Sequence, residues 1–263
     1  MRPELPVHTS ASQLGCYARC PRQYKYRYIE QREPERAAVA LAVGTAVHAA
    51  VQYHFEQRAR GKSPTPSDAL RVLRAELGAL LSDPKLNWTK TTPAEARAEA
   101  ERLLQVFLRE LADLPVAHCE APFEIALHDP ITGEPLPRPL LGYLDHVLTD
   151  GTVIELKTTA RRYSDTDIAA NLQFAAYRVV ARRQRRPDVR LVALLKTKTP
   201  TAQLVSMGVA SHAEERWFLE AVRDIERGIH AGVFPPSPGM ACSTCDFREA
   251  CRGVEEVHRA EAA

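Results

Sequence analysis

The stretch GTVIELKTTA, residues 151–160, predicts a short β-strand that carries charge into an apolar environment. It opens at Gly151, which marks a turn, and continues with aliphatic residues that favour a strand. Because side chains alternate along a strand, Glu155 and Lys157 fall on the same face. Two charges on a strand that otherwise has the pattern of a buried one cost desolvation free energy, so we expect compensating groups opposite them.

The preceding stretch, LLGYLDHVLT at residues 140–149, predicts a second strand with Asp145 near its end. The turn TDG then joins the two strands as a hairpin, which brings Asp145 beside Glu155. Adjacent carboxylates repel each other unless a cation lies between them, and Mg²⁺ binds such oxygens while keeping several waters. Lys157 points the same way and can orient a water or stabilise charge on a phosphate. Asp followed by Glu-x-Lys is the minimal apparatus of metal-assisted phosphodiester cleavage, although the triplet alone is also typical of exposed ion pairs.

The composition is that of a globular protein of 263 residues, 45% hydrophobic and 26% charged. The net charge of +2 does not mark a nucleic-acid binder by bulk electrostatics. No apolar stretch approaches the ~20 residues of a membrane span, and the first residues lack the apolar region of a signal peptide. We therefore expect a cytoplasmic protein that does not contact a membrane, in a compartment where structural disulfides are rare.

The order of the elements predicts an α/β fold in a single domain, residues 1–263. A helix and the first cysteine of interest occupy 10–35, long amphipathic helices occupy 44–115, and strands with one helix between them occupy 116–210. A last helix and a cysteine-rich stretch occupy 211–255. We expect the helices of 44–115 to be an insertion ahead of the α/β core and not a separate domain.

Short motifs accompany the carboxylates in a fixed order: GTAVH ending at His48, GYLD ending at Asp145, ELK at 155–157, and QFAAY, which places Gln173 and Tyr177 on one helix face. Each motif alone would be common by chance, but the ordered set is specific. It resembles the RecB-like branch of the PD-(D/E)XK nuclease superfamily, whose motifs read G-x-x-x-H, G-x-x-D, E-x-K and Q-x-x-x-Y. The resemblance runs from about Ser10 to Cys251.

This resemblance implies a restriction-endonuclease-like mixed sheet flanked by helices, and a site for Mg²⁺ or Mn²⁺. It assigns metal ligation to His48, Asp145, Glu155 and the carbonyl of Leu156. It makes Lys157 the catalytic lysine, while Gln173 and Tyr177 would steady the site or the DNA backbone. Structural alternatives are a histidine packed in the core and a plain helix-face pair.

A second constellation is formed by cysteines, since CSTCDFREAC at 242–251 has the spacing C-x2-C-x5-C and Cys20 lies far upstream. Four cysteines suit zinc or an iron–sulfur cluster, and the spacing does not decide between them. The resemblance to Cas4-like, AddB and exonuclease V relatives favours a [4Fe–4S] cluster held by Cys20, Cys242, Cys245 and Cys251. Such a cluster would tie the N-terminal helix to the C-terminal tail. Cys16, one helical turn before Cys20, is a competing ligand or a packed residue, and Cys119 is most simply a core residue.

The stretch RCPRQYKYRY at 19–28 interleaves four basic residues with three tyrosines. Cations for phosphates and rings for base stacking suit single-stranded nucleic acid. Alternatively, the tyrosines pack near the cysteines while the basic residues face solvent. Neither a sequence-reading module nor a Walker A motif is evident, so a helicase would have to be a partner.

The function that these patterns favour is a metal-dependent DNase, an exonuclease acting on single-stranded DNA or DNA ends. Repair, recombination and phage- or CRISPR-related DNA processing are the settings in which such an enzyme would act. The alternative is a non-catalytic DNA-end-binding subunit of a helicase–nuclease complex. The intact D…ExK pattern argues for catalysis.

Overall fold

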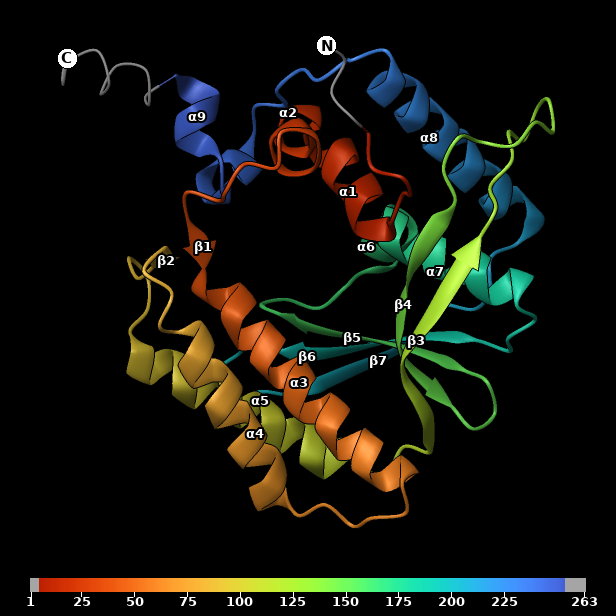
Figure 1. Cartoon of the computed structure of the whole chain (residues 1–263). Coiled ribbons are helices and arrows are strands. Elements are labelled where there is room, and N and C mark those ends of the chain that lie inside the picture. The colour runs from red at the N-terminus through yellow and green to blue at the C-terminus, as the bar shows by residue number, and fades with distance from the viewer. Residues whose placement is uncertain (1–4, 254–263) are drawn as a thin grey trace, which may run out of the picture.

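The computed structural model describes residues 5–253, so residues 254 and 255 of the expected C-terminal segment lie outside the described residues. At its centre is a five-stranded sheet in the order β3-β4-β5-β6-β7 (Figure 1). Its strands are β3 (Val116–Ile125), β4 (Leu140–Leu148), β5 (Val153–Thr159), β6 (Val189–Leu195) and β7 (Ala202–Ser206). β5 and β6 are parallel and the other neighbours are antiparallel. The predicted mixed sheet flanked by helices is thus confirmed.

The parallel pair β5–β6 requires a crossover, which is made by α6 (Asp165–Ala169) and α7 (Leu172–Arg183). The sequence suggested one helix here, but the chain breaks at Asn171, whose side chain caps α7 by accepting hydrogen bonds from two backbone N–H groups. This second start fixes the position of the first turn of α7, which carries Gln173.

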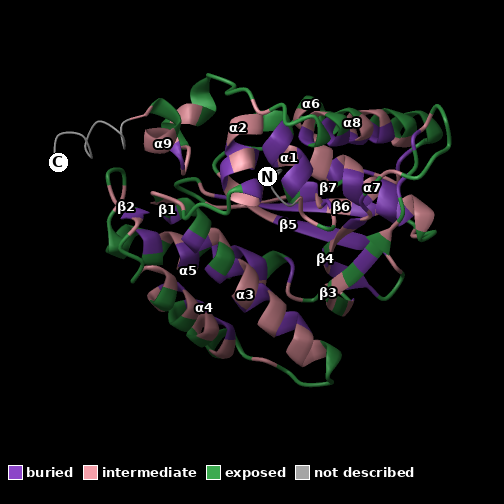
Figure 2. Cartoon of the chain, turned by 45° about the horizontal axis from the view of Figure 1, so that its top comes forward, coloured by how far each residue is buried: buried purple, intermediate pink, exposed green. Residues whose placement is uncertain are grey.

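Two helical layers cover the sheet (Figure 2). On one face, α3 (Val39–Ala59), α4 (Pro66–Leu80) and α5 (Pro93–Glu110) pack with Ile154 and Leu156 of β5. On the other, α1 (Ala11–Arg19), α7 and α8 (His212–His230) pack with Val153 of β5. Alternation along β5 therefore places Glu155 on the α7 side of the strand. The helices expected as an insertion form one complete layer of the core.

Several helix starts follow local signals. Thr65, Thr92, Ser164 and Ser211 each form a reciprocal capping box with an acidic residue three positions later. Ser10 caps α1 by accepting a hydrogen bond from the backbone N–H of Gln13.

The aromatic, basic stretch that follows Cys20 is helical. Pro21 opens α2 (Pro21–Tyr24), a position where its missing N–H costs nothing, and a π-helical turn η1 (Lys25–Ile29) follows. The C-terminal turns η2 (Met240–Thr244) and α9 (Arg248–Arg252) lie beside this segment (Figure 1). A small parallel pair, β1 (Ala37–Ala38) with β2 (Leu86–Asn87), was not expected.

A buried ion pair fixes the N-terminal segment. Arg138 is 4% exposed and forms two hydrogen bonds with the carboxylate of Glu226, which is 2% exposed. The same guanidinium donates to the carbonyls of Pro6 and His8 and to the hydroxyl of Tyr24. The pair therefore holds in place the chain leading into α1.

No helix within residues 5–253 combines the length and apolar character that crossing a membrane requires.

Candidate active site

The site forms where β4 and β5 separate. The two strands pair at His146 with Ile154 and at Val147 with Val153. Beyond His146 the backbone pairing ends, and a side chain links the two strands instead: Asp145 Oδ2 accepts a hydrogen bond of 2.9 Å from the backbone N–H of Leu156. The expected hairpin thus brings Asp145 to the backbone of the Glu-x-Lys segment.

Glu155 is a buried carboxylate without a hydrogen-bond partner in the part of the chain that the structure describes. It is 1% exposed, and its Oε1 lies 2.5 Å from Lys157 Nζ in an ion pair whose geometry is not that of a hydrogen bond. Burial, with the Asp145 charge adding to it, raises the pKa of Glu155 to about 8 despite the opposing effect of Lys157. The positive charge of Lys157 therefore does not balance the negative charges that Asp145 and Glu155 would carry together.

Lys157 is the most exposed of the three, with 26% of its side chain exposed against 17% for Asp145 and 1% for Glu155. Burial works against its charged form, but the ion pair with Glu155 outweighs burial and holds the pKa of Lys157 above its usual value. The amine is thus a cation at neutral pH, available at the open side of the site.

His48 reaches the site because α3 passes close to β5. A side chain on Gly44 would place its Cβ 3.0 Å from Thr158 Oγ1, so the absent side chain allows the close approach. One turn later, His48 Nδ1 lies 3.9 Å from Asp145 Oδ2, and the ring is close to the Leu156 backbone. Burial lowers the pKa of His48 despite Asp145, which favours the neutral imidazole that can bind a metal.

Gln173 and Tyr177 lie one turn apart on α7 and are joined by a hydrogen bond of 3.1 Å from Gln173 Nε2 to the Tyr177 hydroxyl. Burial raises the pKa of Tyr177 well above its usual range, and Glu155 and Asp145 add to the effect. The phenol is therefore a neutral donor close to the carboxylates.

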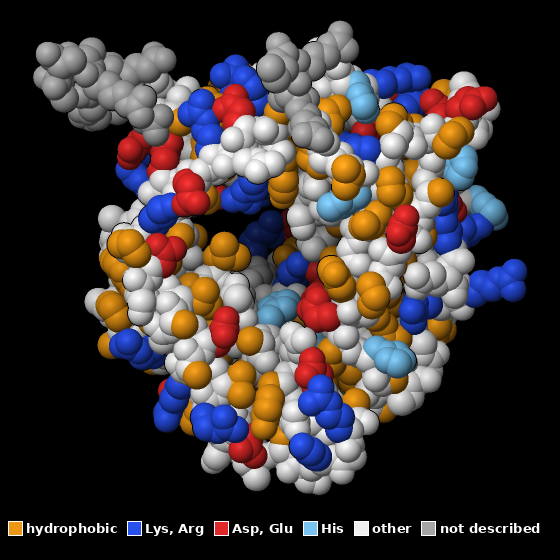
Figure 3. Space-filling view, in the orientation of Figure 1, with side chains coloured by type: hydrophobic (Ala, Val, Ile, Leu, Met, Phe, Trp, Pro, Cys, Tyr) orange, Lys and Arg blue, Asp and Glu red, His pale blue; other side chains and the backbone are white. Residues whose placement is uncertain are grey.

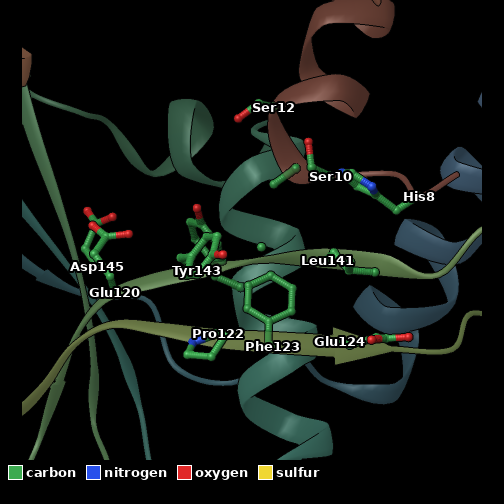
Figure 4. Close-up of a pocket in the computed structure, with 13 residues that line it drawn as sticks. His8, Ser10, Ser12, Glu120, Pro122, Phe123, Glu124, Leu141, Tyr143 and Asp145 are labelled. Carbon is green, nitrogen blue, oxygen red and sulfur yellow. The ribbon is translucent and has the colours of Figure 1, made fainter. Parts of the chain in front are cut away.

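Glu120 is a further acidic residue that the motifs did not indicate. It lies on β3 between Cys119, which pairs with His146, and Ala121, which pairs with Leu144, so it faces Asp145 across the strands. Figure 4 shows the side chains of Glu120 and Asp145 side by side at one end of a cavity. Burial, followed by the Asp145 charge, raises the pKa of Glu120. Only the register between β3 and β4 reveals this neighbour, and no spacing within the sequence does.

The donors present fit a hard divalent cation. Within residues 5–253, no three His, Cys, Asp or Glu side chains are grouped closely enough to surround an ion by themselves. Mg²⁺ does not require that, because it binds through one or two carboxylates and keeps several waters. Asp145, Glu155 and the Leu156 carbonyl offer oxygen ligands, and the buried oxygens of Glu155 accept, within residues 5–253, no hydrogen bond that a cation would have to displace. His48 adds a nitrogen donor on the α3 side.

The four cysteines expected to act together all line one cavity of about 300 Å³: Cys20, Cys242, Cys245 and Cys251. Burial raises the pKa of Cys245, and the neighbouring Asp246, Cys20 and Cys251 raise it further. Cys16 is instead buried in the core between α1 and the sheet, and Cys119 is half-buried beside α3.

Protein contacts hold the C-terminal wall of this cavity. Arg27 forms an ion pair with Asp246, and the ring of Phe247 packs against Tyr26. The carboxylate of Glu35 accepts hydrogen bonds from the backbone N–H groups of Glu249 and Ala250. Segments more than 200 residues apart in sequence are therefore adjacent before any cofactor is considered.

Two of the three tyrosines of residues 19–28 pack inside the molecule, while Tyr28 is half-buried and lines a cavity together with Arg19 and Arg27. Tyr24 and Tyr26 are buried, and Tyr24 stacks on Phe234 with ring centroids 6.3 Å apart. Their rings are thus not available to nucleic-acid bases, and the packing alternative holds for both.

The site opens toward a hollow in the molecular surface. Figure 3 shows this hollow between the start of α3, β1 and the α1–α2 segment, with Lys or Arg side chains inside it and acidic and histidine side chains at its rim. A cavity of about 520 Å³, lined by Arg19, Arg27 and Gln173, shares Ala11 and Ser12 with the Asp145 cavity. Basic side chains are thus continuous with the carboxylate site.

A mixed sheet with the D…ExK residues at the fork of two strands defines a nuclease of the restriction-endonuclease type. The family model described as the PD-(D/E)XK nuclease superfamily matches residues 8–252, and the chain belongs to this superfamily.

One solved structure shows likeness of fold, and a second matches with a lower TM-score. The crystal structure named "Putative exonuclease" from Eubacterium rectale matches with a TM-score of 0.58 at 13% identity, covering 91% of this chain and 87% of that one. A structure of SSO0001 matches with a TM-score of 0.43 at 12% identity, covering 93% of this chain and 85% of that one. Comparison with curated protein sequences gave no match.

Proposed function

We propose that the protein is a metal-dependent DNA exonuclease of the RecB-like, Cas4-like branch, acting on single-stranded DNA or DNA ends. Membership of the superfamily makes it a phosphodiester-cleaving nuclease, a class that typically uses Mg²⁺ or Mn²⁺ and acts on DNA. The observation that carries the proposal is Glu155, a buried carboxylate without a hydrogen bond, adjacent to Asp145 and Lys157.

In this proposal Asp145, Glu155 and the Leu156 carbonyl hold the cation, with His48 as a further ligand. A bound ion would polarise the scissile phosphate and lower the pKa of a bound water. Lys157 supplies a fixed positive charge at the open side of the site, where charge develops on the phosphate. Gln173 and Tyr177, linked by a hydrogen bond, present a neutral donor toward the same place.

Preference for a single strand or an end is supported by the shape of the approach. The carboxylates lie beside a hollow bordered by two segments of the chain, and cavities of about 620 Å³ and 520 Å³ meet at α1. Arg19 and Arg27, which line the smaller cavity, suit phosphates. A helicase partner is compatible with this role, since the chain carries no Walker A sequence.

The cysteine cavity is proposed to hold a [4Fe–4S] cluster with a structural role. Thiolates bind both zinc and iron–sulfur clusters, and the resemblance to Cas4-like, AddB and exonuclease V relatives favours the cluster. Six free thiols support the expectation of a reducing compartment such as the cytoplasm.

Iron and sulfide analysis after anaerobic purification tests the ligand assignment. Cys20→Ser should lose iron and unfold at lower temperature, because a ligand of the cluster is missing. Cys16→Ser and Cys119→Ser should keep full iron. Loss of iron in Cys16→Ser with retention in Cys20→Ser contradicts the assignment, and four bound thiolates with zinc and no iron contradict the cluster but not the nuclease.

The activity is tested with end-labelled DNA in Mn²⁺ and in Mg²⁺, with EDTA as the negative condition. Linear single strands should be shortened from an end, while a circular single strand of the same sequence should resist. Equal cleavage of the circle means an endonuclease. Binding to ends without cleavage in either metal would establish the non-catalytic end-binding alternative.

A further inference from the structure

The cavity beside Asp145 contains an aromatic side chain that the motifs do not explain. Tyr143 lies on β4 two residues before Asp145, and alternation places both side chains on the same face of the strand. Tyr143 is 59% exposed, and no hydrogen bond or ring contact joins its side chain to another residue within 5–253. Figure 4 shows it between the Asp145–Glu120 pair and Phe123, at the floor of the cavity.

The register of the strands gives this ring a defined setting. Its partner across the strands is Pro122 of β3, which lines the same cavity. On the opposite wall, Ser10 and Ser12 come from the start of α1 (Figure 4). The wall is anchored, because Thr9 exchanges backbone hydrogen bonds with Pro139 and Leu141 at the start of β4.

Away from the proposed metal site at Asp145, the charges of this cavity disfavour a phosphate. Its volume is about 620 Å³, and its described lining residues include the carboxylates of Asp145, Glu120 and Glu124 but no Lys or Arg. A neutral, flat group that stacks on Tyr143 fits this environment, and a nucleobase is such a group. The basic side chains that suit phosphates line the adjoining cavity instead.

We infer that Tyr143 stacks on a base of the substrate strand next to the phosphate held at Asp145 and Glu155. This inference rests on the proposed nuclease function and deepens it by naming a residue that positions the substrate strand. Two residues along a strand span about 7 Å, within the reach of a single nucleotide. Stacking on Tyr143 requires a base with a free face, which a single strand presents at every base and a duplex only at its end. Every base has a π-face, so the contact tolerates any sequence.

The test compares Tyr143→Ala, Tyr143→Phe and Tyr143→Trp with wild type on single-stranded oligonucleotides in Mn²⁺. Loss of a stacking ring should raise KM by about 5- to 150-fold while kcat changes little. Tyr143→Phe and Tyr143→Trp should stay near wild type because they keep a ring. Trp217→Ala is the matched control, since Trp217 is an exposed aromatic on α8 that lines a different cavity; its KM should not change.

Oligonucleotides with one abasic site, moved along the strand, locate the stacked base. When the abasic site lies at one position beside the scissile bond, the KM of wild type should rise by the same factor as the Tyr143→Ala substitution raises it. The KM of Tyr143→Ala should not rise further on this oligonucleotide. An unchanged KM in Tyr143→Ala, or equal abasic losses in both proteins at every position, overturns the inference while leaving the nuclease intact. Absence of cleavage by wild type on every substrate with metal overturns the proposed function instead.

Discussion

Replacing Glu155 with Gln should stabilise the protein in the absence of metal at alkaline pH while abolishing its activity. In the folded protein the pKa of this carboxyl is raised to about 8 from its ordinary 4.5 by burial and by Asp145. Between these two values the folded state keeps a proton that the unfolded state has lost. The free energy of unfolding therefore falls as the pH rises from about 4.5 to about 8, and the full loss is present above pH 8.

The size of the effect follows from the difference between the two pKa values. At ~1.36 kcal/mol per pKa unit, the charged Glu155 costs the metal-free folded state up to about 5 kcal/mol above pH 8. A neutral Gln of the same shape does not carry this cost. For a chain of this size, roughly 2–4 °C per kcal/mol gives an increase in melting temperature of about 10 °C or more.

Thermal unfolding of metal-free wild type and Glu155→Gln, measured from pH 5 to pH 9, tests this. The two curves should be close at pH 5 and separate as the pH rises, with the variant more stable. Mn²⁺ should stabilise wild type at pH 9 and leave Glu155→Gln largely unchanged, because a ligand raises stability only where it binds. Glu134→Gln, at an exposed carboxylate, is the control and should follow wild type. A Glu155→Gln protein no more stable than wild type at pH 9 would refute the reasoning.

Three further substitutions test other parts of the structure. Lys157→Met should slow single-turnover cleavage by roughly 10²-fold or more while Mn²⁺ binding persists, because one donor to the transition-state charge is lost; an unchanged rate would leave Lys157 only an ion-pair role. Arg138→Met should lower stability to denaturant by about 3–5 kcal/mol because Glu226 is left buried and unpaired, and adding Glu226→Leu should restore much of the loss. Gly142→Ala should cost about 1–3 kcal/mol, because the new Cβ would lie 2.7 Å from the Phe123 ring, and a denaturation midpoint equal to wild type would contradict that close contact.

The order of elements was predictable because its signals are local. Alternation along residues 151–160, the TDG turn and the Ser/Thr caps each depend on neighbours in sequence, and β4, β5, α4 and α5 begin close to where these signals place them. In contrast, α3 begins at Val39, five residues before the predicted helical part. The two glycines that open the motifs each have a steric role in the fold: Gly44 lets α3 approach β5, and Gly142 makes room for Phe123.

Features that depend on distant pairing were not predictable. Glu120 joins the carboxylates only through the register of β3 on β4, and Tyr24 is buried by the arrival of Phe234 from beyond α8. Residues 21–29 are helical because Pro21 stands at the first position of α2, where proline is favoured. The pair β1–β2 has two residues per strand, too few for a pattern.

Cleavage of end-labelled single-stranded DNA by wild type and Asp145→Asn, combined with Mn²⁺ binding followed by electron paramagnetic resonance, tests the metal-dependent site most directly. An Asn oxygen can keep the hydrogen bond from the Leu156 N–H, so the fold of the fork should persist. Wild type should bind Mn²⁺ and shorten the strand, and Asp145→Asn should bind DNA but neither hold the ion nor cleave. Cleavage by Asp145→Asn at the wild-type rate would contradict a metal centre built on Asp145 and Glu155.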